Sequence, residues 1–141
     1  MVILSASSVM NTILAVVLAI FILLAMITVH EFGHYIAGKL LKFKINEFAI
    51  GFGPKLYRRV SKKNGEAFSI RLLPLGGYCA FDGEDSGGDN PDSFNNKAPW
   101  KRIIVLISGP LMNYLLAMLL IIISMFAFGQ MLFKVTAVTP A

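Results

Sequence analysis

Two long apolar segments enclose a polar middle region in this chain. Residues 9–29 are 21 consecutive positions without a charged side chain, and residues 103–129 form a second uncharged stretch. About 20 apolar residues in a helix, at about 1.5 Å per residue, cross a hydrocarbon core of about 30 Å. The pattern therefore predicts two membrane-spanning helices, and the first continues through His30 to about Leu41.

The first span is predicted to be retained rather than removed as a signal peptide. A signal peptide has a basic start, a shorter apolar run and a cleavage site with small residues. The first 29 residues hold no Lys or Arg, and the apolar run is longer than a signal peptide needs.

The second apolar segment contains Ser108-Gly109-Pro110 near its start. Proline is tolerated in the first turn of a helix but interrupts the hydrogen bonding of a helix interior. Two interpretations stay open: the span begins near Ser108, or residues 98–108 form an interfacial lead-in that ends in a kink.

The region between the spans is predicted to hold a small β-hairpin. Residues 44–51 alternate roughly between apolar and polar, as a half-buried strand does, and a second strand is expected at 66–73. Asn64-Gly65 between two strand-like segments is a hairpin turn signal. Residues 82–93 are rich in Gly, Asp and Ser, which predicts an exposed loop. A sheet edge in lipid would leave backbone groups unpaired, so this hairpin must be covered by protein or lie near water.

Charge gives these elements an orientation. Of the 13 Lys and Arg residues, 12 lie between residues 39 and 102. Cytoplasmic loops of membrane proteins carry such an excess of cations. We therefore expect a multi-pass protein of the cell (inner or plasma) membrane, with its N-terminus outside and its central loop in the cytoplasm.

The predicted fold class is a mainly α membrane protein, in which two transmembrane helices flank a cytoplasmic loop with a small β-hairpin. The expected segments are the first helix at 1–41, the loop at 42–102, the second helix at 103–130 and a C-terminal segment at 131–141.

Composition excludes several other classes of protein. Residues of the AVILMFWYC set make up 56% of the chain, 15% of residues are charged, and the mean hydropathy is +0.69. Soluble domains are roughly 45–50% apolar with about 25% charged residues, and disordered chains are more polar still. The net charge of +5 does not indicate a nucleic-acid partner, because the cations are confined to the loop between the spans. The single Cys79 excludes an intrachain disulfide and a Cys-rich metal site.

The sequence His30-Glu31-Phe32-Gly33-His34 carries the candidate chemistry. Residues i and i+4 of a helix share a face, so both imidazoles can bind one metal ion, and neutral imidazole suits Zn²⁺. Glu31 is placed to take a proton from a water molecule at the metal and pass it on. Chance occurrence is disfavoured, because the chain has no other histidine and Glu31 is the only acid in its first 46 residues. A charged group at the end of a span is costly, which also indicates a function.

Five motifs, in this order, resemble the site-2 protease family of intramembrane zinc metalloproteases, of the bacterial regulator-of-sigma-E type: HEFGH, GFGPKL, LPLGGY, FNNKAPWKR and GPLMNYLLA. The resemblance covers about residues 10–130. It implies that peptide bonds are hydrolysed within the lipid bilayer. The implied substrates are single-span membrane proteins already trimmed by another protease, such as anti-sigma factors, and signal-peptide remnants. It further implies Zn²⁺ as the cofactor, His30 and His34 as its ligands and Glu31 as the catalytic glutamate.

The resemblance also points to residues that contact substrate. Asn113 matches a polar position of the family's second span, where it is expected to line the substrate path or bond the scissile backbone; a helix–helix hydrogen bond is the alternative. Gly76 and Gly77, with the strand at 66–73, resemble the family's membrane-reentrant hairpin. An extended substrate can add to the edge of such a hairpin by β-augmentation.

The third metal ligand is the point where this chain departs from the family. A hydrolytic zinc site usually has three protein ligands and a water. The family takes its third ligand from an Asp in an L-D-G motif on a later span, and no such span occurs in these 141 residues. Phe81-Asp82-Gly83 is similar, but we reject Asp82 as the ligand because turn residues, rather than apolar helix, surround it. Solvated loop charges are expected at the other acids of this region, which are Glu84, Asp85, Asp89 and Asp92.

The last eight residues, 134–141, resemble the first strand of the PDZ domain that follows this span in the family. We therefore expect the chain to be the N-terminal portion of a larger protease, with little proteolysis unless another chain supplies the Asp. The alternative is a catalytically inactive relative that binds metal or substrate without cleaving.

Overall fold

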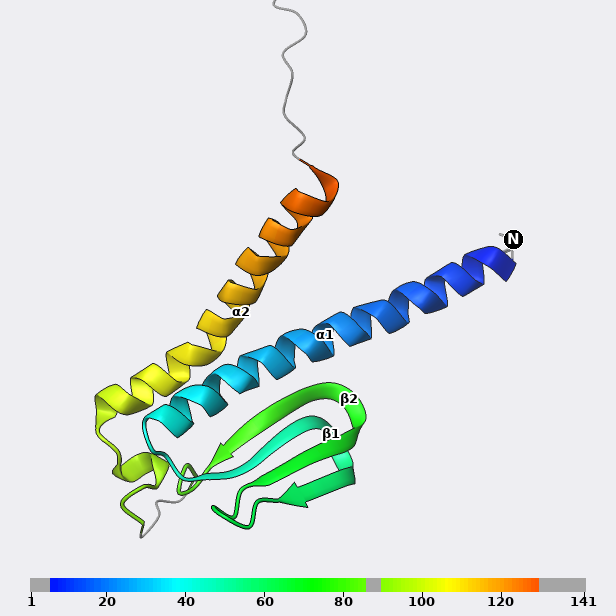
Figure 1. Ribbon diagram of the computed structural model, residues 1–141. Helices are drawn as coiled ribbons and strands as arrows, with labels where there is room; N and C mark the ends of the chain where they lie inside the picture. The colour runs from blue at the N-terminus through cyan, green and yellow to red at the C-terminus, as the bar shows by residue number, and fades with distance from the viewer. Residues whose placement is uncertain (1–5, 86–89, 130–141) are drawn as a thin grey trace, which may run out of the picture.

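The computed structural model of the protein describes residues 6–85 and 90–129. Its elements are helix α1 (Ala6–Leu40), strands β1 (Ile45–Val60) and β2 (Ala67–Phe81), the short 3-10 helix η1 (Phe94–Asn96) and helix α2 (Pro99–Phe128). The two strands lie along the C-terminal half of α1, and α2 meets α1 there and diverges from it toward the N-terminus of α1 (Figure 1). The described chain is therefore mainly helical with a small antiparallel sheet. The segment expected at 131–141 lies outside the described residues.

Both long helices have apolar surfaces. Within the described residues, Ser7–Leu40 and Pro99–Phe128 are long and apolar enough to cross a membrane. Most of their large apolar side chains are exposed, for example Leu14, Phe21, Ile121 and Phe126. Such a surface would be costly in water.

Helix α2 is continuous from Pro99 to Phe128 and so joins the expected lead-in to the apolar segment. Pro99 stands in its first turn, where a missing N–H costs nothing. Pro110 lies inside the helix, where it removes the bond to the carbonyl four residues earlier, and α2 changes direction along its length in Figure 1. The structure thus favours a lead-in that continues into the apolar segment over a helix that begins near Ser108.

The hairpin is longer than predicted because both strands bend and return. Residues 45–50 of β1 pair with 77–81 of β2, and 55–60 of β1 pair with 67–71. Residues 47–50 also lie opposite 67–70. The hairpin is therefore folded double, and within the described residues the segment 77–81 pairs along one side only.

Glycines make the bends. Gly51 and Gly53 in β1 and Gly76 in β2 have φ angles of +85°, +81° and +112°, which residues with a Cβ rarely adopt. A Cβ at Gly76 would also overlap the ring of Phe52. The structure thus gives Gly76 a role in the shape of the hairpin.

A small aromatic core joins the helices to the sheet. Its buried members are Ala37, Phe43, Ile45, Phe81, Phe94 and Val105. The ring centroids of Phe43, Phe81 and Phe94 lie 5.4 to 5.7 Å apart, within the usual range for aromatic packing. A Cβ at Gly38 would lie 2.5 Å from Phe81, so this glycine lets the ring reach α1.

Asp82 organises the start of the loop after β2. Its backbone N–H donates to Lys44 O over 2.9 Å, and its carbonyl accepts from the N–H of Phe94 over 2.7 Å. Its carboxylate accepts a 2.6 Å bond from the hydroxyl of buried Ser93, which holds the pKa of this carboxyl below its usual value. Asp82 therefore ties the start of the loop to Lys44 and to the residues at the end of the loop. Of the acids expected to be solvated, Glu84, Asp85 and Asp92 are exposed, and Asp89 lies outside the described residues.

Glu47 anchors the doubled hairpin through its carboxylate. The carboxylate accepts hydrogen bonds from Ser69 (2.7 Å) and Tyr78 (2.9 Å) and pairs with Arg71 at 3.3 Å and Lys55 at 3.4 Å. Burial opposes its ionisation, but these hydrogen bonds and cations prevail and lower the pKa of Glu47 to about 2. The segment 77–81 is thereby tied to the rest of the sheet through Tyr78.

Replacing this carboxylate should destabilise the protein in a pH-dependent way. Since the pKa of Glu47 falls from 4.5 to about 2 on folding, its stabilisation is complete above pH 4.5 and is lost as pH falls toward 2. We expect Glu47→Gln to lower the unfolding temperature at pH 7 by roughly 5 °C, with a smaller difference at pH 3. Circular dichroism of the protein in detergent micelles measures this, with Asp85→Asn as the control. A difference that does not change with pH would contradict the assignment.

Candidate active site

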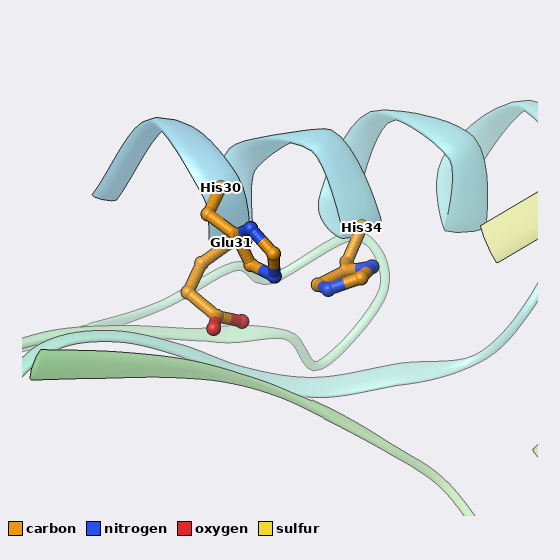
Figure 2. Close-up of side chains that lie close together, drawn as sticks. All are labelled: His30, Glu31 and His34. Atoms are coloured by element: carbon orange, nitrogen blue, oxygen red, sulfur yellow. The ribbon is translucent and has the colours of Figure 1, made fainter. Parts of the chain in front are cut away.

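The residues of the HExxH motif meet on one side of α1. The ring centroids of His30 and His34 lie 4.9 Å apart, and candidate ligand atoms of His30, Glu31 and His34 all lie within 4.8 Å of one another. Figure 2 shows the two rings side by side, with the carboxylate of Glu31 pointing toward the hairpin. Within residues 6–85 and 90–129, no other three His, Cys, Asp or Glu residues gather in this way.

Helix α2 contacts the Nδ1 atom of each imidazole. Nδ1 of His34 lies 2.7 Å from the carbonyl oxygen of Val105. A carbonyl can only accept, so Nδ1 carries a proton; in a neutral ring, Nε2 then has the lone pair. Nδ1 of His30 lies 3.3 Å from Nδ2 of Asn113.

The two Nε2 atoms face the space that Gly109 leaves open. A Cβ on Gly109 would lie 2.5 Å from Nε2 of His34 and 2.7 Å from Nε2 of His30. Zinc–nitrogen bonds are about 2.0–2.1 Å long, so the absent side chain leaves room for an ion between the rings. The residues present therefore fit Zn²⁺, with His30 and His34 as two ligands.

A methyl group at residue 109 should abolish this fit. We expect Gly109→Ala to weaken zinc binding on the order of 10–100-fold, a loss typical of disturbed ligand geometry. Competition with a chromophoric chelator measures the affinity of the purified chain. Ala117→Val, which adds bulk at an exposed position of the same helix, is the control and should bind as the parent does. Unchanged affinity in Gly109→Ala would show that zinc does not occupy this space.

Glu31 lies against the segment 77–81 of β2, which pairs along one side only within the described residues. A Cβ on Gly77 would be 3.7 Å from Cγ of Glu31. A cavity of about 360 Å³ opens here, and its walls include Glu31, His34, Tyr78, Cys79, Phe81 and Val105. The glutamate is thus within reach of a chain that would lie along 77–81.

Cys79 lines the same cavity without being a nucleophile. Burial, then the negative charges of Glu31, Glu84 and Glu66, raises the pKa of this thiol to about 12. A thiol with such a pKa stays protonated at neutral pH. Among the acids at this cavity, Glu31 is the one that lies in the group with the two histidines.

Several residues singled out from the sequence have clear places in the structure. Asp82 is outside the metal-binding group and is engaged by Ser93, which agrees with its rejection as a ligand. Gly77 lies against Glu31, whereas Gly76 forms a bend. Asn113 contacts a histidine, and its contact with substrate stays a prediction.

Sequence reasoning did not assign a function to Gly109 or to the carbonyl of Val105. The available signal was Ser108-Gly109-Pro110 within an apolar segment, which we interpreted as either the start of the span or a kink. A backbone carbonyl has no signature in the sequence, so the partner of His34 could not be predicted.

Comparison with known proteins shows the family to which the chain belongs. Residues 18–139 match the family model described as Peptidase family M50. The chain belongs to peptidase family M50. This confirms the resemblance to the site-2 proteases, and the matched range includes the HExxH sequence.

Individual relatives agree with this assignment. A protein of Clostridium acetobutylicum is 44% identical over 105 residues, which cover 74% of this chain and 30% of the relative. A protein of Clostridium perfringens is 40% identical over 126 residues, covering 89% of this chain and 37% of the relative. One from Fusobacterium nucleatum is 34% identical over 121 residues, covering 86% and 35%. All three bear the name "putative zinc metalloprotease", and the chain spans about a third of their length.

Proposed function

We propose that this M50 chain carries the zinc-binding and proton-transfer residues of an intramembrane endopeptidase that cleaves single-span membrane proteins. The observation that carries the proposal is the arrangement of His30, His34 and Glu31. Both Nε2 atoms face the space beside Gly109. The carboxylate adjoins a cavity lined by a strand segment that, within the described residues, pairs along one side only. Because the chain spans about a third of its relatives, the activity proposed is that of the whole protein.

The depth of the site supports chemistry at a membrane boundary. His30 follows residues 9–29 of α1, 21 positions without a charged side chain, about the length that crosses a hydrocarbon core. The 12 cations at residues 39–102 favour a cytoplasmic location for the hairpin and an external N-terminus. A site at this depth receives water from the cytoplasm, which hydrolysis of a peptide bond consumes.

Each residue of the site would have its own role in the reaction. His30 and His34 would hold Zn²⁺, which supplies a Lewis acid that lowers the pKa of water to about 7 and polarises a carbonyl. Glu31 accepts the proton of the attacking water and delivers it to the nitrogen of the leaving amine. The carbonyl of Val105 orients the ring of His34. Gly109 leaves the space between the two histidine rings open.

The segment 77–81, which has one unpaired edge within the described residues, is an argument for binding of an extended substrate backbone beside Glu31. A helical substrate hides its carbonyls in hydrogen bonds, so the segment to be cut must unwind. Pairing with 77–81 would satisfy the backbone groups that unwinding releases. This favours substrates with small or helix-breaking residues near the cut. Anti-sigma factors and signal-peptide remnants, the substrates implied by the resemblance to the site-2 proteases, belong to this class of single apolar helices.

The alternative function is a family member that binds metal or substrate without cleaving. It is favoured by one observation: within the described residues, the metal-binding group consists of two histidines and Glu31 alone. A hydrolytic zinc site usually has a third protein ligand. In the endopeptidase, the Asp that the resemblance to the site-2 proteases implies, on a later span or on another chain, would complete the site.

The variant Glu31→Gln tests whether the protein cleaves through Glu31 or only binds metal or substrate. In the complete protein, we expect this change to reduce cleavage of a model single-span substrate by at least about 100-fold, while zinc still binds. Gel electrophoresis of the substrate and the chelator competition described above measure the two properties.

Glu84→Gln is the matched control, because Glu84 is an exposed acid at the same cavity. It should cleave as the parent does. Equal cleavage by Glu31→Gln and the parent would contradict the mechanism. Zinc binding without cleavage by the complete parent protein would establish the alternative.

A further inference from the structure

One face of α2 follows the face of α1 that carries the histidines. Val105, Gly109 and Asn113 stand four residues apart on α2, as His30 and His34 do on α1. Val105 bonds Nδ1 of His34, Gly109 faces both Nε2 atoms, and Asn113 contacts Nδ1 of His30. Helix α2 therefore contacts the Nδ1 atom of each ring, which is the ring nitrogen away from the proposed metal.

The contact with Asn113 bears on which nitrogen of His30 carries the proton. A neutral imidazole has one N–H and one lone pair, and a metal ion needs the lone pair. Nε2 is the atom that faces the space at Gly109. The zinc-binding form of His30 therefore carries its proton on Nδ1, 3.3 Å from the amide of Asn113.

The amide of Asn113 can hydrogen-bond to either tautomer of the His30 ring, because its Nδ2 donates and its Oδ1 accepts. With Nδ2 toward the ring, it donates to Nδ1, and the proton of His30 lies on Nε2, which blocks the metal. In this orientation the Oδ1 atom is buried without a hydrogen-bond partner among the described residues, so no hydrogen bond of Oδ1 fixes the amide in this orientation. A half-turn of the amide brings Oδ1 to Nδ1, where it accepts the N–H and leaves Nε2 free.

We propose that Asn113 is a positioning residue of the metal site. Its amide oxygen accepts the Nδ1 proton of His30 and so holds the ring in the form whose Nε2 binds a divalent metal. The Val105 carbonyl does the same for His34. The proposal rests on the zinc site proposed above, and it gives Asn113 a role that does not require contact with substrate.

Zinc affinity of the purified 141-residue chain in micelles tests this proposal. Asn113→Leu should weaken zinc binding by roughly 10–100-fold, as loss of a partner of a ligating histidine does. Asn113→Asp keeps an acceptor and should bind at least as tightly as the parent. Tyr114→Phe, at the exposed neighbouring position, should have no effect. Circular dichroism establishes that each variant keeps its helices.

A second measurement needs no variant. The ¹⁵N chemical shifts of the parent protein distinguish protonated from unprotonated ring nitrogens. With zinc added, we expect a protonated Nδ1 in His30.

The outcomes distinguish this inference from the proposed function. If the parent binds no zinc, both are wrong. If the parent binds zinc but folded Asn113→Leu binds it equally well, Asn113 is only a contact between helices and the proposed function stands. Equal losses in Asn113→Leu and Asn113→Asp, or a protonated Nε2 in zinc-loaded parent, would also overturn the positioning role.

Discussion

The close approach of α1 and α2 is the constraint on which the site depends. Gly33 of α1 sits where a Cβ would overlap the carbonyl oxygen of Ser108, and Gly109 of α2 sits where a Cβ would meet both imidazoles. Small residues commonly allow such contacts between apolar helices. Larger side chains here would separate the helices and break the bonds from α2 to His30 and His34. The same approach thus places the two histidines, orients their rings and leaves space for an ion.

The hairpin adds the second half of the site through the bending of its strands. Its glycine bends return the chain so that 77–81 becomes an edge next to Glu31. The carboxylate of Glu47 holds Tyr78 of this edge from the neighbouring strand, and the rings around Phe81 fix its far end against α1. An unpaired edge is normally a liability; under the proposed function, it is where an unwound substrate would pair.

The parts of this structure that depend on local pattern could be predicted from the sequence. The two apolar helices, the turn near Asn64 and the shared face of His30 and His34 follow from periodicity and turn chemistry over a few residues. The full length of the strands could not be predicted from the sequence, because the alternation of apolar and polar residues stops at the glycine bends while the strand pairing continues beyond them. The contacts from α2 could not be predicted either. The residues involved lie 71 and 83 positions from their histidines, and one of them acts through a backbone carbonyl.

The central claim is that Nε2 of His30 and Nε2 of His34 bind one zinc ion beside Gly109. X-ray absorption at the zinc edge of the purified, zinc-loaded chain tests this most directly. The account predicts two imidazole nitrogens at about 2.0–2.1 Å from the metal, and the loss of one of them in His34→Ala. A zinc spectrum without imidazole scattering, or one that His34→Ala leaves unchanged, would contradict it.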